Sequence, residues 1–250
     1  MRRALLAAAA LLVCLAAGCG KGYSSTRGAT LTHFTLHSND VGRDLHEMLV
    51  VPPRHSDVLL VLLHGRSSPP SSFLSQPFFD ALAKLGSRAP TVLLLDGGDH
   101  SYWHDRTDGK WGAMVVDEAI PAGLARTNTS RVAIGGISMG GYGALELGAR
   151  RDFCAVGGHS AALWFHGGDS APGAFDDAAD FARHDLIAHP PRYRSPVWVD
   201  VGTSDPFHDA DVAFAHKIHA RLHVWPGGHE SSYWHAHMAE YLNFYADACS

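Results

Sequence analysis

The sequence predicts a three-layer α/β/α sandwich, in which helices cover both faces of a mostly parallel sheet of about eight strands. Two observations carry this prediction. Short apolar runs that end in glycine recur along the 250 residues, and segments with helical periodicity separate them. Continuous apolar runs are typical of strands buried on both faces of a parallel sheet, and their alternation with helices indicates βα crossovers. Because no internal repeat or long linker divides the chain, we expect one domain over residues 31–250.

Each expected strand has its own signal. Thr32–Ser38 alternates between polar and apolar residues, and Leu45–Val51 ends before Pro52 and Pro53. The other expected strands are apolar runs: Val58–Gly65, Thr91–Gly98, Arg131–Gly136, Phe153–Ser160, Pro196–Gly202 and Arg221–Gly228. The expected helices are Phe73–Leu85, Trp111–Arg126, Gly141–Arg150, Phe207–His219 and Tyr233–Ala246. Ligands of open parallel sheets bind beyond the carboxyl ends of the strands, so the residues after each apolar run are the candidates for a site.

The first 30 residues predict an export signal followed by a short tether. Basic residues precede an apolar segment, Ala4–Ala17, which is shorter than the roughly 20 residues of a membrane-spanning helix. The segment leads into "LAAGC", which resembles the lipobox of bacterial lipoproteins, with Cys19 as the lipidated residue. We therefore expect a signal peptide over residues 1–18, a polar tether over residues 19–30, and a lipoprotein anchored to a membrane of the bacterial envelope. A secreted or periplasmic protein without the lipid is the alternative.

Composition bears on the class of partner and on the state of the cysteines. The net charge is −5 and the 20 Lys and Arg residues form no basic run, so nucleic acid is not an expected partner. Apart from Cys14 and Cys19, the chain holds Cys154 and Cys249, which in an exported protein either form a disulfide or remain two separate thiols. The sequence does not indicate an oligomeric state.

The segment "GISMG", Gly136–Gly140, is the most informative motif. It matches G-x-S-x-G and stands between an expected strand and an expected helix. A tight strand-to-helix turn brings backbone segments so close that glycine is needed, and it projects the Ser138 hydroxyl above the sheet at a helix N-terminus. A flexible glycine-rich turn is the alternative, but the strand–turn–helix context favours a nucleophilic serine.

A serine hydroxyl is a weak nucleophile, so Ser138 needs a base and an acid that orients the base. In this architecture the chain order is serine, acid, histidine. Asp205, in "TSDPF", and His229, in "GGHES", follow expected strands in that order. Asp209 is the rival to Asp205, about one helical turn further on, whereas Asp200 falls inside a strand. We therefore predict a triad of Ser138, His229 and Asp205.

Attack on an ester carbonyl creates an oxyanion that two N–H groups should stabilise. The expected donors are the backbone amides of Met139, directly after the serine, and of Arg66, in the loop "HGRSS". Alternatively, His64 and Gly65 merely end the strand.

Aromatic residues near the strand ends are expected to line the substrate cleft. The side chains in this set are His64, Tyr102, Trp103, Trp164 and Trp234. The segment Asp99–Asp105, "DHSYWHD", is rich in possible metal ligands, but its spacing matches no established ligand pattern. We expect it to form an aromatic wall, and we expect no metal and no cofactor.

Four segments carry a resemblance to a known family: "DGGDHSYWHD", "WGAMVVDEAIP", "RVAIGGISMGGYGALELG" and "PGGHESSYWHAHMAEYLNFYA". The chain resembles serine esterases of the α/β-hydrolase superfamily, in the branch of esterase D, S-formylglutathione hydrolase, feruloyl esterases and the antigen 85 mycolyltransferases. The resemblance spans Leu59 to Ala246. It implies the α/β-hydrolase fold and assigns the nucleophile, acid and base roles to Ser138, Asp205 and His229.

The expected function is a serine carboxylesterase that acts on small-molecule esters with short-chain or aromatic acyl groups. The stretch between His159 and Pro196 is short for this family, which leaves little room for a large lid and argues against an enclosed lipid pocket. Two other functions stay open: an acyltransferase that passes the acyl group to a sugar or lipid alcohol, and a non-catalytic envelope protein that uses the fold for binding.

Overall fold

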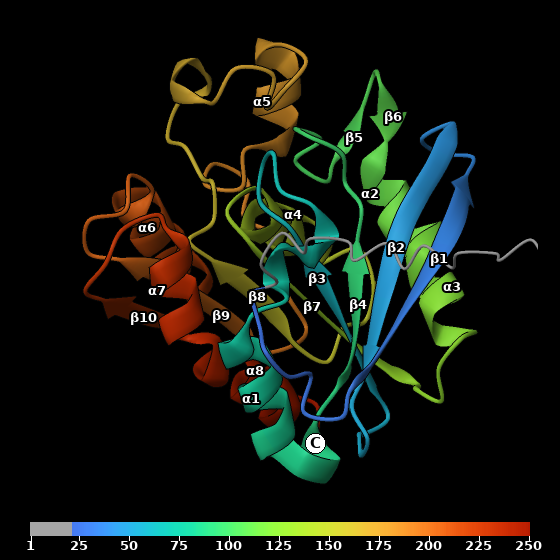
Figure 1. Cartoon of the computed structure of the whole chain (residues 1–250). Helices are drawn as coiled ribbons and strands as arrows, with labels where there is room; N and C mark the ends of the chain where they lie inside the picture. Colours follow the sequence, from blue (N-terminus) through green and yellow to red (C-terminus); the bar gives the residue numbers. More distant parts are fainter. Residues whose placement is uncertain (1–21) are drawn as a thin grey trace, which may run out of the picture.

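The computed structural model describes residues 22–250, whose arrangement is shown in Figure 1. The predicted signal peptide and Cys19 lie outside the described residues. Within residues 22–250, no helix is both long enough and apolar enough to cross a bilayer.

A central sheet of eight strands organises the chain in the order β1-β2-β4-β3-β7-β8-β9-β10. The strands are β1 (Thr30–Ser38), β2 (Arg43–Val51), β3 (Val58–Leu63), β4 (Thr91–Leu95), β7 (Arg131–Ile137), β8 (Val156–His159), β9 (Val197–Gly202) and β10 (Arg221–Trp225). The β1–β2 and β2–β4 pairs are antiparallel, and all other neighbouring pairs in this sheet are parallel. The prediction of a mostly parallel sheet of about eight strands is confirmed.

Helices cover both faces of this sheet, because the central strands are apolar on both sides. All six residues of β3 are buried, and they alternate between two core clusters. One cluster contains α2 (Trp111–Ala113), α3 (Ile120–Leu124), α4 (Met139–Leu147) and α6 (His208–Ile218); the other contains α1 (Gln76–Leu85) and α8 (Met238–Ala248). In Figure 1, α1 and α8 lie together on the near face of the sheet. The three-layer α/β/α prediction is confirmed.

Several short elements differ from the sequence-based expectation. The helix expected over residues 111–126 contains a π-helical segment, η3 (Met114–Ala119), between α2 and α3. Pro121 follows it, and proline lacks an N–H and crowds the carbonyl four residues earlier, which the wider π turn accommodates. The expected C-terminal helix is divided at His237 into α7 (Ser231–Ala236) and α8. Elements that were not expected are β5 (Asp105–Arg106), β6 (Gly109–Lys110), α5 (Ala178–His184), η1 (Pro70–Phe73), η2 (Gly86–Arg88) and η4 (Gly167–Asp169).

The described part of the expected tether is fixed to α1. The backbone amides of Ser24 and Ser25 donate to Oε1 of Gln76, at 2.9 and 3.1 Å. Arg27 forms an ion pair with Asp80 at 2.6 Å. Ser24, Ser25 and Arg27 are therefore held against α1.

Cys154 and Cys249 are joined by a disulfide bond across 95 residues of sequence. The bond ties the segment before β8 to the end of α8. Of the two alternatives that the sequence leaves open, the structure has the bridge rather than separate thiols.

Candidate active site

Ser138 lies in a sharp turn between β7 and α4, where the parallel strands end. Its φ and ψ are 57° and −116°, a conformation that non-glycine residues rarely adopt. Three backbone segments meet here, which explains the glycines. A Cβ on Gly136 would lie 2.2 Å from the carbonyl oxygen of Gly140, and a Cβ on Gly140 would lie 1.8 Å from that of Leu63. Packing thus enforces the strained backbone of Ser138 and holds its hydroxyl at the start of α4.

Ser138, His229 and Asp205 form one continuous line of hydrogen bonds. Nε2 of His229 is 2.8 Å from Oγ of Ser138, and Nδ1 of His229 is 2.9 Å from Oδ2 of Asp205. The carboxylate is inaccessible to solvent, whereas 23% of the His229 side chain is exposed. The imidazole stands between the rings of Phe207 and Trp234, with centroids at 5.0 and 5.1 Å. The structure therefore brings together the three residues predicted from separate strand ends.

The two other aspartates near these strand ends contact residues other than His229. The side chain of Asp209 is 89% exposed and contacts His208. Asp200 is fully buried, and its carboxylate accepts from the indole of Trp198 and the hydroxyl of Tyr241. Of these three aspartates, Asp205 is the one that contacts His229.

The hydrogen bonds of Asp205 keep it ionised. Burial alone raises the pKa of this carboxyl, but the hydrogen bonds from His229 and from the Phe207 amide outweigh it, so the pKa lies below its usual value. The Phe207 N–H donates to Oδ1 at 2.9 Å, which leaves Oδ2 for the imidazole. An ionised acceptor at this place holds the proton of His229 on Nδ1 and leaves Nε2 free to accept.

Two backbone amides adjoin the serine hydroxyl. Met139 is the first residue of α4, so its N–H has no acceptor within the helix. The loop after β3 comes close to the serine: a Cβ on Gly65 would lie 3.4 Å from Cβ of Ser138. No acceptor for the Arg66 N–H is found among residues 22–250. Both amides are thus available for a negatively charged oxygen.

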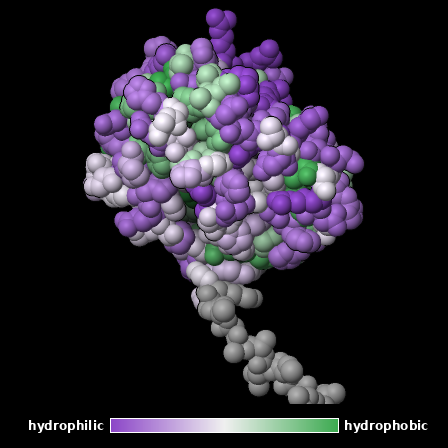
Figure 2. All heavy atoms as spheres, turned by 90° about the horizontal axis from the view of Figure 1, so that it is seen from above, coloured by the Kyte–Doolittle hydropathy of each residue, from purple (hydrophilic) through white to green (hydrophobic). Residues whose placement is uncertain are grey.

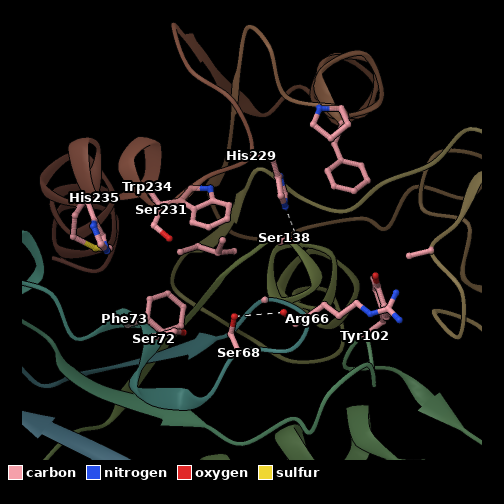
Figure 3. A pocket seen from close by; sticks show the side chains of 16 residues that line it. Arg66, Ser68, Ser72, Phe73, Tyr102, Ser138, His229, Ser231, Trp234 and His235 are labelled. Atoms are coloured by element: carbon pink, nitrogen blue, oxygen red, sulfur yellow. Dashed lines mark hydrogen bonds between the residues drawn. The ribbon is translucent and has the colours of Figure 1, made fainter. Parts of the chain in front are cut away.

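A pocket of about 450 Å³ opens at Ser138. Seen from above, the molecule shows hydrophobic side chains between hydrophilic ones on the side where the parallel strands end (Figure 2). The lining residues are Gly65, Arg66, Ser68, Ser72, Phe73, Tyr102, Ile137, Ser138, Ala171, Pro206, Phe207, His229, Ser231, Trp234, His235 and Met238. Figure 3 shows Phe73 and Trp234 on one side of Ser138, and the Arg66 side chain extending to Tyr102 on the other. Aromatic and aliphatic walls around few polar groups are typical of small-molecule sites.

Two of the expected cleft residues are buried beneath the pocket, so that part of the prediction is wrong. His64 is 1% exposed; its Nδ1 is 2.8 Å from the Gly65 carbonyl, and its Nε2 accepts from the Gly97 N–H at 3.0 Å. Burial lowers the pKa of His64, and these partners place its proton on Nδ1. Trp103 is fully buried, and its indole donates to the His64 carbonyl at 3.2 Å. The pair braces the loop that carries Arg66.

The other three aromatic residues lie at or behind the wall. Tyr102 and Trp234 line the pocket as predicted. Trp164 does not line it, but its ring packs against Tyr102 and Phe207, with centroids at 5.6 and 5.5 Å. Trp164 therefore supports the wall from outside.

Several lining residues were missed by the sequence-based reasoning. Phe207 directly follows Asp205 and Pro206 after a strand end, so its position in the sequence was enough to predict that it lines the pocket. Phe73 and Met238 belong to helical segments that are distant in sequence, and no local pattern indicates that they meet at Ser138.

Comparisons with known proteins identify the family of the chain. The family model described as "Putative esterase" matches residues 120–245, half of the chain, and this range contains Ser138, Asp205 and His229. No curated protein sequence matches the chain.

Solved structures share the architecture over nearly the whole chain. A ferulic acid esterase has 20% identity over 89% of this chain and 98% of its own, with a TM-score of 0.75. The S-formylglutathione hydrolase of Agrobacterium tumefaciens has 16% identity over 91% of this chain and 98% of its own (TM-score 0.71). MPT51 of Mycobacterium tuberculosis has 16% identity over 89% of this chain and 100% of its own (TM-score 0.65). These likenesses show a shared α/β-hydrolase fold, and with the family match the chain belongs to the esterase family, as a carboxylic ester hydrolase.

Proposed function

We propose that this esterase hydrolyses short-chain or aromatic acyl esters through an acyl-enzyme on Ser138. The observation that carries the proposal is the unbroken hydrogen-bonded line from Asp205 through His229 to Ser138, at the wall of a pocket large enough for a small ester.

In the first half of the reaction, His229 accepts the Ser138 proton at Nε2 while the serine oxygen attacks the ester carbonyl. The amides of Met139 and Arg66 donate to the oxyanion, and Asp205 stabilises the imidazolium that forms. As the tetrahedral intermediate collapses, His229 gives the proton to the departing alcohol. The acyl group then remains on Ser138.

In the second half, water replaces the alcohol. His229 takes a proton from the water as it attacks the acyl carbonyl, the same amides hold the oxyanion, and the proton returns to Ser138 as the acid leaves. The proton transfers in this sequence use the hydrogen-bonded line of Asp205, His229 and Ser138.

The pocket walls support the substrate class. Tyr102, Phe207 and Trp234 offer flat apolar surfaces beside the serine, which suit an aromatic or short acyl group. The indole of Trp234 donates to the Ser160 hydroxyl at 3.1 Å, so this wall is held in place. The named activity of the ferulic acid esterase with the same fold fits this class.

The test is hydrolysis of nitrophenyl esters from acetate to palmitate and of an alkyl ferulate. We expect turnover that falls with long acyl chains and that Ser138→Ala abolishes. Ser130→Ala, at an exposed serine before β7, should behave as the wild type. Undiminished activity of Ser138→Ala would overturn the nucleophile. A preference for palmitate would overturn the substrate class, and acyl transfer to an added alcohol faster than hydrolysis would favour an acyltransferase.

We further propose that the protein is exported and anchored through a lipid on Cys19. The lipobox-like sequence supports this, as does the disulfide between Cys154 and Cys249, since such bonds persist in oxidising compartments. Mass spectrometry of the mature N-terminus should find a diacylated Cys19. An unmodified terminus at another residue would contradict it.

A further inference from the structure

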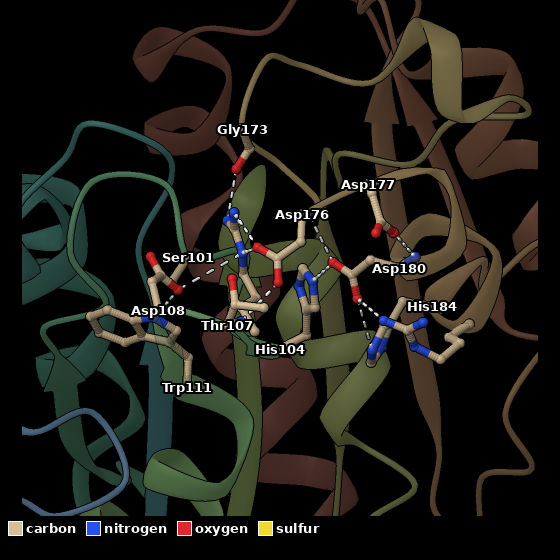
Figure 4. A network of polar contacts seen from close by, with 12 residues as sticks. Ser101, His104, Thr107, Asp108, Trp111, Gly173, Asp176, Asp177, Asp180 and His184 are labelled. Atoms are coloured by element: carbon tan, nitrogen blue, oxygen red, sulfur yellow. Dashed lines mark hydrogen bonds and ion pairs between the residues drawn. The ribbon is translucent and has the colours of Figure 1, made fainter.

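His104, Asp180 and His184 form a cluster of possible metal ligands outside the active-site pocket (Figure 4). Nε2 of His104 lies 3.2 Å from Oδ2 of Asp180, and Nε2 of His184 lies 3.6 Å from Oδ1 of Asp180. One ligand atom from each residue lies within 4.8 Å of the others. Tetrahedral zinc with bonds of about 2.0–2.2 Å holds its ligand atoms about 3.4 Å apart, so modest side-chain rotations would close this set around one ion.

The backbone fixes these three side chains from two segments. Asp180 and His184 are four residues apart on α5, which places them on one face of the helix. The Asp177 carboxylate caps α5 by accepting from the Asp180 N–H at 2.7 Å. His104 follows Tyr102 and Trp103, whose φ values are 51° and 60°. Two successive residues in this strained region persist only where the surrounding packing holds them.

The donor atoms suit a cation. His104 is fully buried, its Nδ1 has no hydrogen-bond partner among the described residues, and its Nε2 lies 3.2 Å from the Asp180 carboxylate. Asp180 is also buried, and the same carboxylate oxygen accepts from the Asp176 N–H at 2.9 Å. Two imidazoles and one carboxylate are a common zinc donor set.

A second carboxylate stands behind the cluster. Oε1 of Glu146 lies 3.5 Å from Nδ1 of His184, on the ring nitrogen that faces away from Asp180. Oε2 of Glu146 is buried and has no partner within residues 22–250. Histidines that bind a metal usually give their other N–H to such a carboxylate, which orients the ring. Glu146 is therefore placed as the positioning residue of His184.

The Arg183 side chain competes with a metal ion for the carboxylate of Asp180. Arg183 donates to Oδ1 of Asp180 at 3.1 Å, but its side chain is 64% exposed. Because the guanidinium is largely solvated, it can turn into solvent when a dication binds to Asp180. The His184 side chain is 17% exposed, so an ion can reach the cluster from solvent.

We propose that His104, Asp180 and His184 bind one Zn²⁺ ion, with water as a fourth ligand. The ion would clamp α5 to the loop that carries Tyr102, a wall residue of the pocket, and so would stabilise the fold without contacting the ester. The proposal does not depend on the substrate or on the triad.

The experiment measures bound zinc and thermal stability of the protein after chelation and reloading with ZnCl₂. We expect one retained equivalent and a rise in Tm of roughly 5–10 °C at a free concentration 100 times the Kd. Asp180→Asn and His184→Gln should lose both effects, whereas His189→Gln, at an exposed histidine of the same region, should keep them. Co²⁺ in place of Zn²⁺ should give the visible spectrum of a tetrahedral site in the wild type and not in His184→Gln.

Two results would overturn the site. No retained zinc and no rise in Tm in the wild type would show that the cluster only joins α5 to the loop by hydrogen bonds. Equal zinc retention by His184→Gln and the wild type would place the metal on other histidines. Because His184 is partly exposed, its variant is expected to fold even if Asp180→Asn does not.

Discussion

Replacing Asp205 by asparagine tests the proposed triad at its most buried member. The Phe207 amide donates to Oδ1 and His229 faces Oδ2. The carbonyl oxygen of an asparagine should therefore take the Oδ1 position, because only it can accept from the Phe207 N–H. Its NH₂ group is then turned toward Nδ1 of His229.

That arrangement forces the wrong tautomer on the imidazole. Nδ1 must accept from the new amide, so the proton moves to Nε2 and points at the hydroxyl of Ser138. The base can no longer accept the serine proton, although no heavy atom has moved. Loss of the acid in a triad of this kind lowers kcat about 10⁴-fold, which corresponds to about 5 kcal/mol of transition-state stabilisation.

The assay is kcat and KM for nitrophenyl acetate at neutral pH, for Asp205→Asn and for Asp209→Asn. The first variant should lose about four orders of magnitude in kcat with little change in KM, and Asp209→Asn should match the wild type because its side chain is 89% exposed. A loss of less than tenfold for Asp205→Asn, or an equal loss for Asp209→Asn, would refute the tautomer argument.

Three further predictions concern stability. Burial raises the pKa of Glu47 from 4.5 to about 8, so the folded state holds a proton that the unfolded state releases, and stability falls as pH rises from about 4.5 to 8. Glu47→Gln should remove this fall and stabilise the protein at pH 9 by up to about 5 kcal/mol in urea unfolding, with the exposed Glu240→Gln unchanged. Gly140→Ala should destabilise by about 3 kcal/mol or more, because its Cβ would overlap a backbone carbonyl of the β3 end; normal expression and Tm would contradict this. Cys154→Ser, or reduction of its bond to Cys249, should cost about 2–5 kcal/mol, and an unchanged denaturation midpoint would show that the bridge contributes nothing.

The parts of the fold that could be predicted are those whose signal is local. The run Val58–Leu63 is apolar at every position, and a strand buried on both faces is the structure that satisfies it. In contrast, α5 is only seven residues long, and its one buried residue is Asp180 rather than an apolar side chain, so it has no buried apolar periodicity to detect. The π-helical segment before Pro121 keeps a helix-like pattern and differs only in its turn width, which residue types do not specify.

Local signals likewise predicted the triad, but they did not predict which aromatic residues line the pocket. Ser138, Asp205 and His229 each lie shortly after the end of a strand, and a parallel sheet gathers strand ends at one edge, so local signals were enough to predict that they meet. Whether an aromatic side chain near that edge lines the pocket depends on the depth of its loop. Trp103 and Tyr102 are neighbours in sequence, yet the first is fully buried and the second lines the pocket, because successive positive φ values turn the two rings apart.

His104 shows the limit of spacing rules for metal sites. Within Asp99–Asp105 its neighbours match no ligand pattern, and the sequence alone gave no reason to expect a metal there. Its partners stand about 75 to 80 residues further on, on a helix that the sequence did not reveal. Ligand spacing indicates a metal site only when most ligands come from one segment. A set divided between a strained loop and a short helix can be recognised only after folding has joined them, and zinc retention by His184→Gln compared with His189→Gln is the measurement that decides whether this one binds.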